Sequence, residues 1–131
     1  MRELTCDLFL TIDGFAAGDD VGPFFGYAGP EVDAWVHSNL ERPQVDAGVA
    51  IAELKQEQGE PLRTIGSISL VRSLLALDLV DRLRLVVFPL TLGDTGRERA
   101  LSDYPRTSFE LAGSSVLDGR LVALDYGPRR S

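Results

Sequence analysis

The residue pair Gly66–Ser67 stands where a strand-like pattern gives way to a helical one. The stretch LRTIGSISLVRSLL, residues 62–75, favours a strand as far as the glycine and becomes an apolar helical pattern after the serine. Free N–H groups at a helix start, beside a glycine that permits close approach, form a site for an anion, often a phosphate. The same pair also suits a tight turn and a helix N-cap, so a purely structural role stays open.

Residue types that serve metal or nucleophile chemistry are scarce. His37 is the only histidine and Cys6 the only cysteine, so one chain can form neither a multi-histidine metal site nor a disulfide. The sequence contains no Gly-x-Ser-x-Gly elbow, and its carboxylates lack the spacing of metal ligands. We therefore expect no metal and no serine-hydrolase activity.

Charge is distributed unevenly along the 131 residues. Residues 1–61 carry 12 acidic and 3 basic side chains and residues 62–131 carry 8 acidic and 10 basic ones, which gives the net charge of −7. All ten cations of the second half are arginines, which suit bidentate contacts to phosphate or carboxylate. Because nucleic-acid affinity depends on clustered cations, the acidic balance argues against a nucleic-acid partner.

The elements that must position the Gly66–Ser67 turn alternate between strand and helix patterns. Strands are predicted over residues 4–12, 61–66 and 83–90, and helices over residues 31–42, 46–58 and 67–77. Residues 108–126 are predicted to form two strands joined by Asp118–Gly119, a strong hairpin signal. We therefore predict an α/β fold in one domain over residues 1–131: a mixed sheet flanked by helices that ends in an antiparallel hairpin.

The segment 14–30 is predicted to be an irregular loop. It contains five glycines and two prolines, which do not suit a regular packed element. It also carries large apolar groups at Phe15, Phe24, Phe25 and Tyr27, so we expect it to fold over part of the protein.

Three predicted loops should meet at one edge of the sheet. Gly66–Ser67, Asp13–Gly14 and Pro89–Gly93 each follow a predicted strand, and ligands of open α/β sheets bind beyond the carboxyl ends of parallel strands. The chain shows neither a signal-peptide pattern nor an 18-residue apolar run. We therefore expect a soluble cytoplasmic protein with a small-molecule crevice and no membrane partner.

Several segments, in order, resemble the dihydrofolate-reductase-like superfamily. They are LFLTIDGFAAG (residues 8–18), GPEVDAWV (29–36) and RTIGSISLVRSLLALDLVDRLRLVVFPLTLG (63–93), followed by the hairpin. They are similar to small bacterial reductases of the kind represented by the C-terminal reductase domain of the riboflavin-biosynthesis deaminase-reductase. The resemblance implies a three-layer mixed sheet that binds NADPH and passes a hydride to a small pterin- or pyrimidine-like heterocycle.

The resemblance also implies which residues line the site. The cofactor would contact the helix start and the first strand end, at Gly66, Ser67, Ile68, Ser69, Gly14 and Ala16. The substrate side would involve Trp35 and the end of the third strand, at Phe88, Pro89, Leu92 and Gly93, with core packing as the alternative for Phe88. Asp13 is nominated as the catalytic polar group, although Asp-Gly is also a plain turn.

Two departures from the family pattern stand out. Val32 takes the place of the substrate-binding carboxylate of dihydrofolate reductases, and Asp33 lies one residue later, a rotation of about 100° on a helix, so folate is not the expected substrate. Between Val45 and Asp46 a central family segment, including the part that holds the cofactor's 2′-phosphate, is missing. Arg63 or Arg72 would have to replace it. A sheet interrupted in this way must close its edge differently, which favours a homodimer.

Three functional hypotheses follow from the sequence. The first is an NADPH-dependent reductase of a small heterocycle, in which the cofactor supplies the hydride and the protein supplies orientation and a proton. The second is a protein of the same fold that binds a nucleotide or small molecule without turnover. The third is a structural or interaction protein in which the glycine turn is only a turn.

Overall fold

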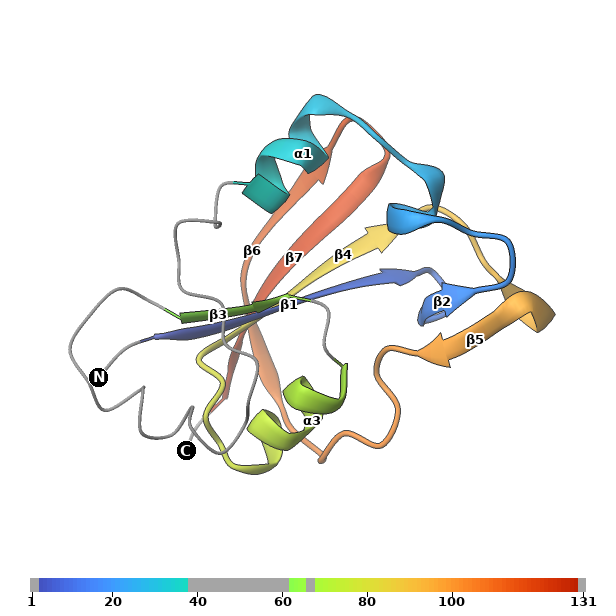
Figure 1. Ribbon diagram of the computed structural model, residues 1–131. Coiled ribbons are helices and arrows are strands. Elements are labelled where there is room, and N and C mark those ends of the chain that lie inside the picture. The colour runs from blue at the N-terminus through green and yellow to red at the C-terminus, as the bar shows by residue number, and fades with distance from the viewer. Residues whose placement is uncertain (1–2, 38–61, 66–67, 130–131) are drawn as a thin grey trace.

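The structure is a computed structural model that describes residues 3–37, 62–65 and 68–129 (Figure 1). The strands are β1 (Leu4–Thr11), β2 (Phe15–Gly18), β3 (Leu62–Ile65), β4 (Arg82–Phe88), β5 (Gly96–Arg99), β6 (Phe109–Leu117) and β7 (Leu121–Pro128). The helices are α1 (Pro30–His37) and α3 (Ile68–Ala76), together with the short 3₁₀ helices η1 (Pro23–Gly26) and η2 (Gly93–Thr95).

Five strands form one mixed sheet in the order β3-β1-β4-β7-β6. β1 lies in the middle of the parallel part, between β3 and β4, and β7 pairs antiparallel with both β4 and β6. The predicted mixed sheet with a C-terminal hairpin is thereby confirmed. The hairpin turn contains Asp118 and Gly119, both with positive φ (53° and 67°), a conformation that these two residue types tolerate well.

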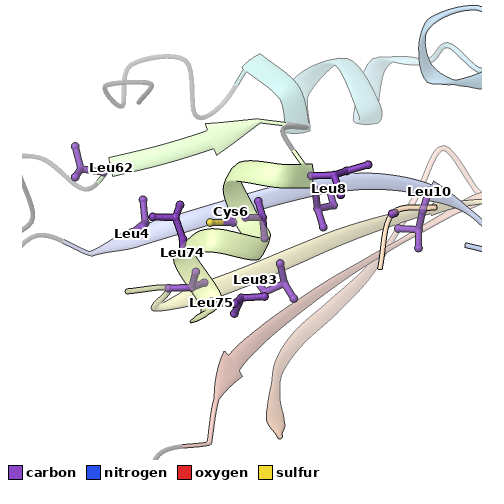
Figure 2. Close-up of a cluster of buried hydrophobic side chains, with 12 residues drawn as sticks. Leu4, Cys6, Leu8, Leu10, Leu62, Leu74, Leu75 and Leu83 are labelled. Carbon is purple, nitrogen blue, oxygen red and sulfur yellow. The ribbon is translucent and has the colours of Figure 1, made fainter. Parts of the chain in front are cut away.

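The two faces of β1 have different partners, because side chains alternate along a strand. Its even-numbered residues from Leu4 to Leu10 are buried in one cluster, in which Leu4 and Cys6 lie beside Leu74 of α3 (Figure 2). Within α3 the buried positions Ile68, Val71, Leu74 and Leu75 follow the spacing of three and four residues that the sequence predicts. This cluster fixes α3 against the parallel part of the sheet.

The opposite face of the sheet is covered by α1, which gives three layers (Figure 1). Val32 of α1 is buried against a cluster formed by β4, β6 and β7, which includes Val86, Phe88 and Leu121. Val32 is therefore the residue through which α1 packs into this cluster.

A row of charges crosses the α1 face of the sheet beneath the helix layer. Asp7 of β1 is 1% exposed and accepts hydrogen bonds from Arg63 of β3 (Nε to Oδ2, 2.8 Å) and from Arg84 of β4 (Nε to Oδ1 and Nη2 to Oδ2, both 2.7 Å). Two cations therefore share one buried carboxylate. The ring of Trp35 lies over the guanidinium of Arg84 at 4.2 Å and covers this row from the α1 side.

The prediction of an irregular loop over residues 14–30 is wrong in part. Phe15–Gly18 form β2, which pairs antiparallel with β5 in a separate two-stranded sheet, with irregular register. The end of β2 packs so closely on η2 that a Cβ at Gly18 would lie 2.7 Å from the Leu92 side chain. Sequence patterns missed β2 because its partner lies about eighty residues later and neither strand shows clear alternation.

The remaining predicted elements agree with the described residues. α1, β3, α3 and β4 lie within or close to the ranges predicted from sequence. The predicted helix over residues 46–58, the end of the helix over 31–42 and the junction Val45–Asp46 lie outside the described residues.

Candidate functional site

A cavity of about 270 Å³ lies beside the carboxyl-terminal half of β1. Its walls come from β1, β2, the segment leading into η1, and the first residue of α3, through Leu8, Phe9, Ala16, Ala17, Val21, Gly22, Phe24, Phe25 and Ile68. The sequence predicts a crevice beyond the carboxyl ends of the parallel strands, formed by Gly66–Ser67, Asp13–Gly14 and Pro89–Gly93, and none of these residues is among the described residues that line this cavity. The walls of the cavity are apolar, and none of its described lining residues carries a charge.

The η1 segment closes the cavity with two aromatic side chains in a strained backbone. Phe24 and Phe25 both have φ of 54°, a left-handed conformation that costs roughly 1–2 kcal/mol for each bulky residue. Ring packing offsets this cost: Phe24 meets Phe9 edge-on with centroids 5.2 Å apart, and Phe25 lies 5.0 Å from Phe88. The apolar character of the 14–30 segment is therefore explained by its position over the cavity.

Asp13 holds two loops together at the edge of this region. Its carboxylate accepts hydrogen bonds from the Thr11 hydroxyl (2.6 Å), from the Leu92 N–H (3.1 Å) and from the Gly93 N–H (2.9 Å). The hydrogen bond from Thr11, followed by that from Gly93, holds the pKa of Asp13 below its ordinary value. An ionised carboxylate that already accepts three hydrogen bonds is a poor proton donor, so this geometry favours the turn interpretation.

The predicted cofactor residues are only partly brought together. Ala16 and Ile68 line the cavity. Gly14 lies in the turn after β1 with φ of 86°, and its carbonyl accepts a hydrogen bond from the Ala100 N–H. Gly66 and Ser67 lie outside the described residues, as does the side chain of Ser69.

The predicted substrate residues are scattered. Phe88 is fully buried and forms the floor beneath η1, in line with the core-packing alternative. Leu92 is buried beside Gly18, whereas Pro89 and Gly93 are exposed. None of these four lines the cavity.

Trp35 lies away from the cavity, on the α1 face of the sheet. It borders a separate hollow of about 200 Å³ together with Arg84, Ser114, Ser115 and Asp125. The expectation that Trp35 contacts the substrate is not supported by this placement. A helix pattern fixes which residues of α1 face inward but not where on the sheet they lie.

The two arginines proposed to replace the missing phosphate partner are engaged elsewhere. Arg63 is 1% exposed and bound to Asp7. Arg72 lies with its guanidinium 5.8 Å from the centre of the Tyr104 ring, and neither arginine lines the cavity. Burial against Asp7 leaves Arg63 unavailable to a 2′-phosphate, whereas for Arg72 the expectation stays a prediction.

Of the described residues that line the cavity, only Ala16 and Ile68 were predicted as site residues. Leu8 and Phe9 belong to the predicted first strand, and the other missed residues lie in the segment 14–30 that is predicted to be an irregular loop: Ala17, Val21, Gly22, Phe24 and Phe25. The only available signal was the apolar content of that loop.

Two further properties concern the part of the chain that the structure describes. No helix there is both long and apolar enough to span a membrane. Among the same residues, no cluster of three or more histidine, cysteine, aspartate or glutamate side chains is placed to hold a metal ion.

Comparison with known proteins gives one family match. The model of the family described as the RibD C-terminal domain matches residues 28–123. No curated protein sequence matches the chain.

Several solved structures share the fold at low sequence identity. A putative riboflavin biosynthesis protein from Shewanella sp. PV-4 has a TM-score of 0.64 at 14% identity, and the match covers 98% of this chain and 100% of the other. A pyrimidine reductase-like protein from Corynebacterium diphtheriae has a TM-score of 0.63 at 13% identity, with 99% and 93% covered. The riboflavin biosynthesis reductase Rib7 from Saccharomyces cerevisiae has a TM-score of 0.60 at 13% identity, with 98% and 89% covered. The dihydrofolate-reductase-like α/β fold expected from sequence is confirmed.

Proposed function

Since the chain belongs to the RibD C-terminal domain family, whose model matches residues 28–123, we propose that it is an NADPH-dependent reductase of a small pterin- or pyrimidine-like heterocycle. The coarser conclusion, a riboflavin-biosynthesis reductase-like domain, rests on the family match and the shared fold. The identity of the cofactor and of the heterocycle is the proposal.

The observation that carries the proposal is the apolar cavity beside β1. Its volume of about 270 Å³ suits one planar ring rather than a whole dinucleotide. Its walls offer aliphatic and aromatic surfaces on several sides, from Ile68, Ala16 and Phe24. An uncharged, flat ring such as a nicotinamide or a pyrimidine matches these walls because neither needs a charged partner.

The cavity residues fit a nicotinamide ring, and a bound NADPH would supply the hydride. Ala16, Ala17 and Ile68 would hold the ring through apolar contacts, and Gly22 leaves room beside it because it has no side chain. The diphosphate would contact the start of α3, at the predicted residues Gly66 and Ser67.

The chain's own residues orient the ring and exclude water. Phe24 and Phe25 cover the cavity, so a ring inside it is shielded on that side. Asp13 acts here as a positioning residue, because its hydrogen bonds to the N–H groups of Leu92 and Gly93 hold η2 against the end of β1. A proton for the reduced heterocycle would then come from solvent rather than from Asp13.

A second candidate function is binding of the same ligands without turnover. It is favoured by the absence of any titratable side chain among the described residues that line the cavity. Hydride transfer to a heterocycle also requires a proton, so a site without an acid or an ordered water would bind but not reduce.

The first experiment separates binding from turnover. NADPH is titrated into the protein while the fluorescence of the reduced nicotinamide is followed, and NADPH oxidation is then measured by absorbance with pterin and pyrimidine substrates. Saturable binding with oxidation supports the reductase, and saturable binding without oxidation supports the second function. No binding at millimolar NADPH would contradict both.

A matched pair of variants tests whether NADPH binds in this cavity. Ala17→Leu adds a bulky group inside the cavity and is expected to weaken NADPH binding about tenfold or more. Ala112→Leu makes the same chemical change at an exposed position of β6 and should leave binding unchanged. If Ala17→Leu and Ala112→Leu bind NADPH with equal affinity, NADPH does not bind in this cavity.

We also propose a homodimer in the cytoplasm. Within the described residues β3 pairs only with β1, so it forms one edge of the sheet, and edge strands favour association with another chain. Sedimentation velocity at several protein concentrations tests the dimer, and a monomer at all of them would contradict it.

A further inference from the structure

A second cavity lies on the α3 side of the sheet, at the opposite end of that helix from the candidate site. Its volume is about 500 Å³, within the range of about 300–1,000 Å³ typical of small-molecule pockets. The first cavity touches α3 at Ile68, and the second touches it at Leu75, seven residues and about 10 Å further along the helix. The two cavities share no lining residue.

The floor of the second cavity is formed by the sheet. Leu83 and Leu85 of β4 project toward α3, and Tyr126 of β7 and Phe109 of β6 continue the same surface. The rings of Phe109 and Tyr126 meet edge to face, with centroids 6.2 Å apart. The floor therefore presents two aromatic rings beside aliphatic side chains.

The remaining wall comes from the segment that links β5 to β6, which runs on the α3 side of the sheet (Figure 1). Leu101, Tyr104, Pro105, Arg106 and Thr107 of this segment line the cavity. The guanidinium of Arg72 lies 5.8 Å from the centre of the Tyr104 ring, and the Tyr104 hydroxyl is buried without a hydrogen-bond partner among the described residues. Tyr104 therefore contributes an aromatic ring to this wall.

The charged side chain that lines this cavity is positive. Arg106 is the only charged residue among those that line it, and its side chain is exposed and forms no ion pair with any residue that the structure describes. Thr107, beside it, adds a hydroxyl group at an exposed position. An anionic group at the mouth would meet a cation and no carboxylate.

We propose that this cavity is a second binding site, separate from the candidate active site, for a flat aromatic anion of about two fused rings. The rings of the ligand would lie between the leucines of β4 and the aromatic side chains of Tyr104, Phe109 and Tyr126. Its carboxylate or sulfonate would point to Arg106 at the mouth. The proposal stands independently of the reductase function, because it uses none of the residues of the first cavity.

The test uses 2-naphthoate as the probe and isothermal titration calorimetry as the readout, first on the protein alone and then after addition of NADPH. Saturable binding is expected, and 2-naphthylmethanol, which has the same rings without the charge, should bind about threefold more weakly. No saturable binding of 2-naphthoate, or displacement of bound 2-naphthoate by NADPH, would overturn the proposal.

Two variants with matched controls locate the probe. Thr107→Trp places an indole at the mouth and should weaken binding about tenfold or more, whereas Thr107→Ser should not. Arg106→Gln should weaken binding about threefold, whereas Arg129→Gln, at an exposed residue that does not line the cavity, should have no effect. Unchanged affinity in Thr107→Trp would overturn the assignment, provided that its circular dichroism spectrum matches that of the parent protein.

A second copy of the chain is the competing occupant of this surface. If the parent protein sediments as a dimer and Thr107→Trp as a monomer, the cavity belongs to an interface between copies and the ligand proposal fails. An unchanged oligomeric state together with lost 2-naphthoate binding supports it.

Discussion

Asp118 and Glu31, which are 87 residues apart in the sequence, exchange two hydrogen bonds. The Glu31 N–H donates to Asp118 Oδ1 and the Asp118 N–H donates to Glu31 Oε1, each at 3.0 Å. Asp118 Oδ2 also accepts the Val32 N–H at 3.0 Å. The turn of the C-terminal hairpin therefore caps the N-terminus of α1, in the reciprocal manner of a capping box but between distant segments.

Asp118→Ala should lower the free energy of unfolding by about 1–2 kcal/mol, because two N–H groups of the first turn of α1 lose their acceptor. Urea unfolding monitored by circular dichroism measures this change. Asp103→Ala is the matched control, since Asp103 also has positive φ (63°) and is exposed, so it reports the backbone cost alone. Equal losses in the two variants would show that the cap contributes nothing.

Gly29→Ala should disturb the same cap without removing the carboxylate. A Cβ at this position would overlap the Asp118 side chain, so that side chain would have to move. We expect Gly29→Ala to add little further destabilisation when Asp118 is already alanine, because the two changes remove one interaction. Full additivity in the double variant would contradict the shared mechanism.

Removing the carboxylate at Asp7 should strongly destabilise the protein. Asp7→Asn leaves Arg63 and Arg84 buried around a neutral group, and breaking a buried pair in this way costs about 3–5 kcal/mol. Asp19→Asn removes an ion pair to Arg97 whose side chains are about half exposed, so it should cost far less stability than Asp7→Asn. Chemical unfolding of both variants provides the comparison.

Stability should depend on the ionisation of Asp13 in acid. Its pKa is lower in the folded protein than its ordinary value because the Thr11 hydroxyl and the N–H groups of Gly93 and Leu92 bind the charged form. The stabilisation is therefore fully present above about pH 4, the ordinary carboxyl range, and is lost as pH falls through the lowered folded pKa. Thermal unfolding between neutral and acid pH should show the parent and Asp13→Asn converging as pH falls. A constant difference at every pH would contradict this linkage.

The same Asp13→Asn variant also tests its role in catalysis. If Asp13 only positions the η2 segment, Asp13→Asn should weaken NADPH binding together with the hydrogen bonds from Leu92 and Gly93. The pH dependence of turnover should then keep its shape. Loss of an acidic limb from the pH–rate profile would instead assign Asp13 as a group that exchanges protons during turnover.

Cys6 should be unreactive in the folded protein. Burial raises the pKa of its thiol to about 12, and the side chain lies in the cluster between β1 and α3 (Figure 2). The thiolate is the reactive form, so labelling by dithionitrobenzoate at mildly alkaline pH should proceed only through unfolding. Addition of urea should raise the labelling rate in step with the unfolded fraction, and rapid labelling without urea would place Cys6 at an accessible position.

Local sequence patterns were sufficient for the elements that pack by simple periodicity. The run of apolar and β-favouring residues from Leu4 to the Asp13–Gly14 turn identified β1, and the spacing of Val71, Leu74 and Leu75 identified α3. Asp118–Gly119 marked the hairpin because few residue pairs tolerate positive φ at a turn. In each case the signal and its structural cause lie within a few residues of one another.

Contacts between distant segments left no such local signal. β2 was missed because its partner β5 follows about eighty residues later. Trp35 was expected at the substrate site, but the docking of α1 on the sheet places it over Arg84. The nomination of Asp13 was ambiguous for the same reason, since only the fold brings the N–H groups of Leu92 and Gly93 to its carboxylate.

The sequence by itself determined the family resemblance and the order of the elements of the main sheet and its helices, because these follow from periodicity and turn residues. It also predicted, from the direction of the parallel strands, the edge of the sheet at which we expect a ligand to bind. Only the tertiary structure decided which side chains surround the cavity, which charges are already paired and where a second cavity opens behind α3. Those properties depend on how elements far apart in the chain pack against each other, and packing is a property of the whole fold rather than of any one segment.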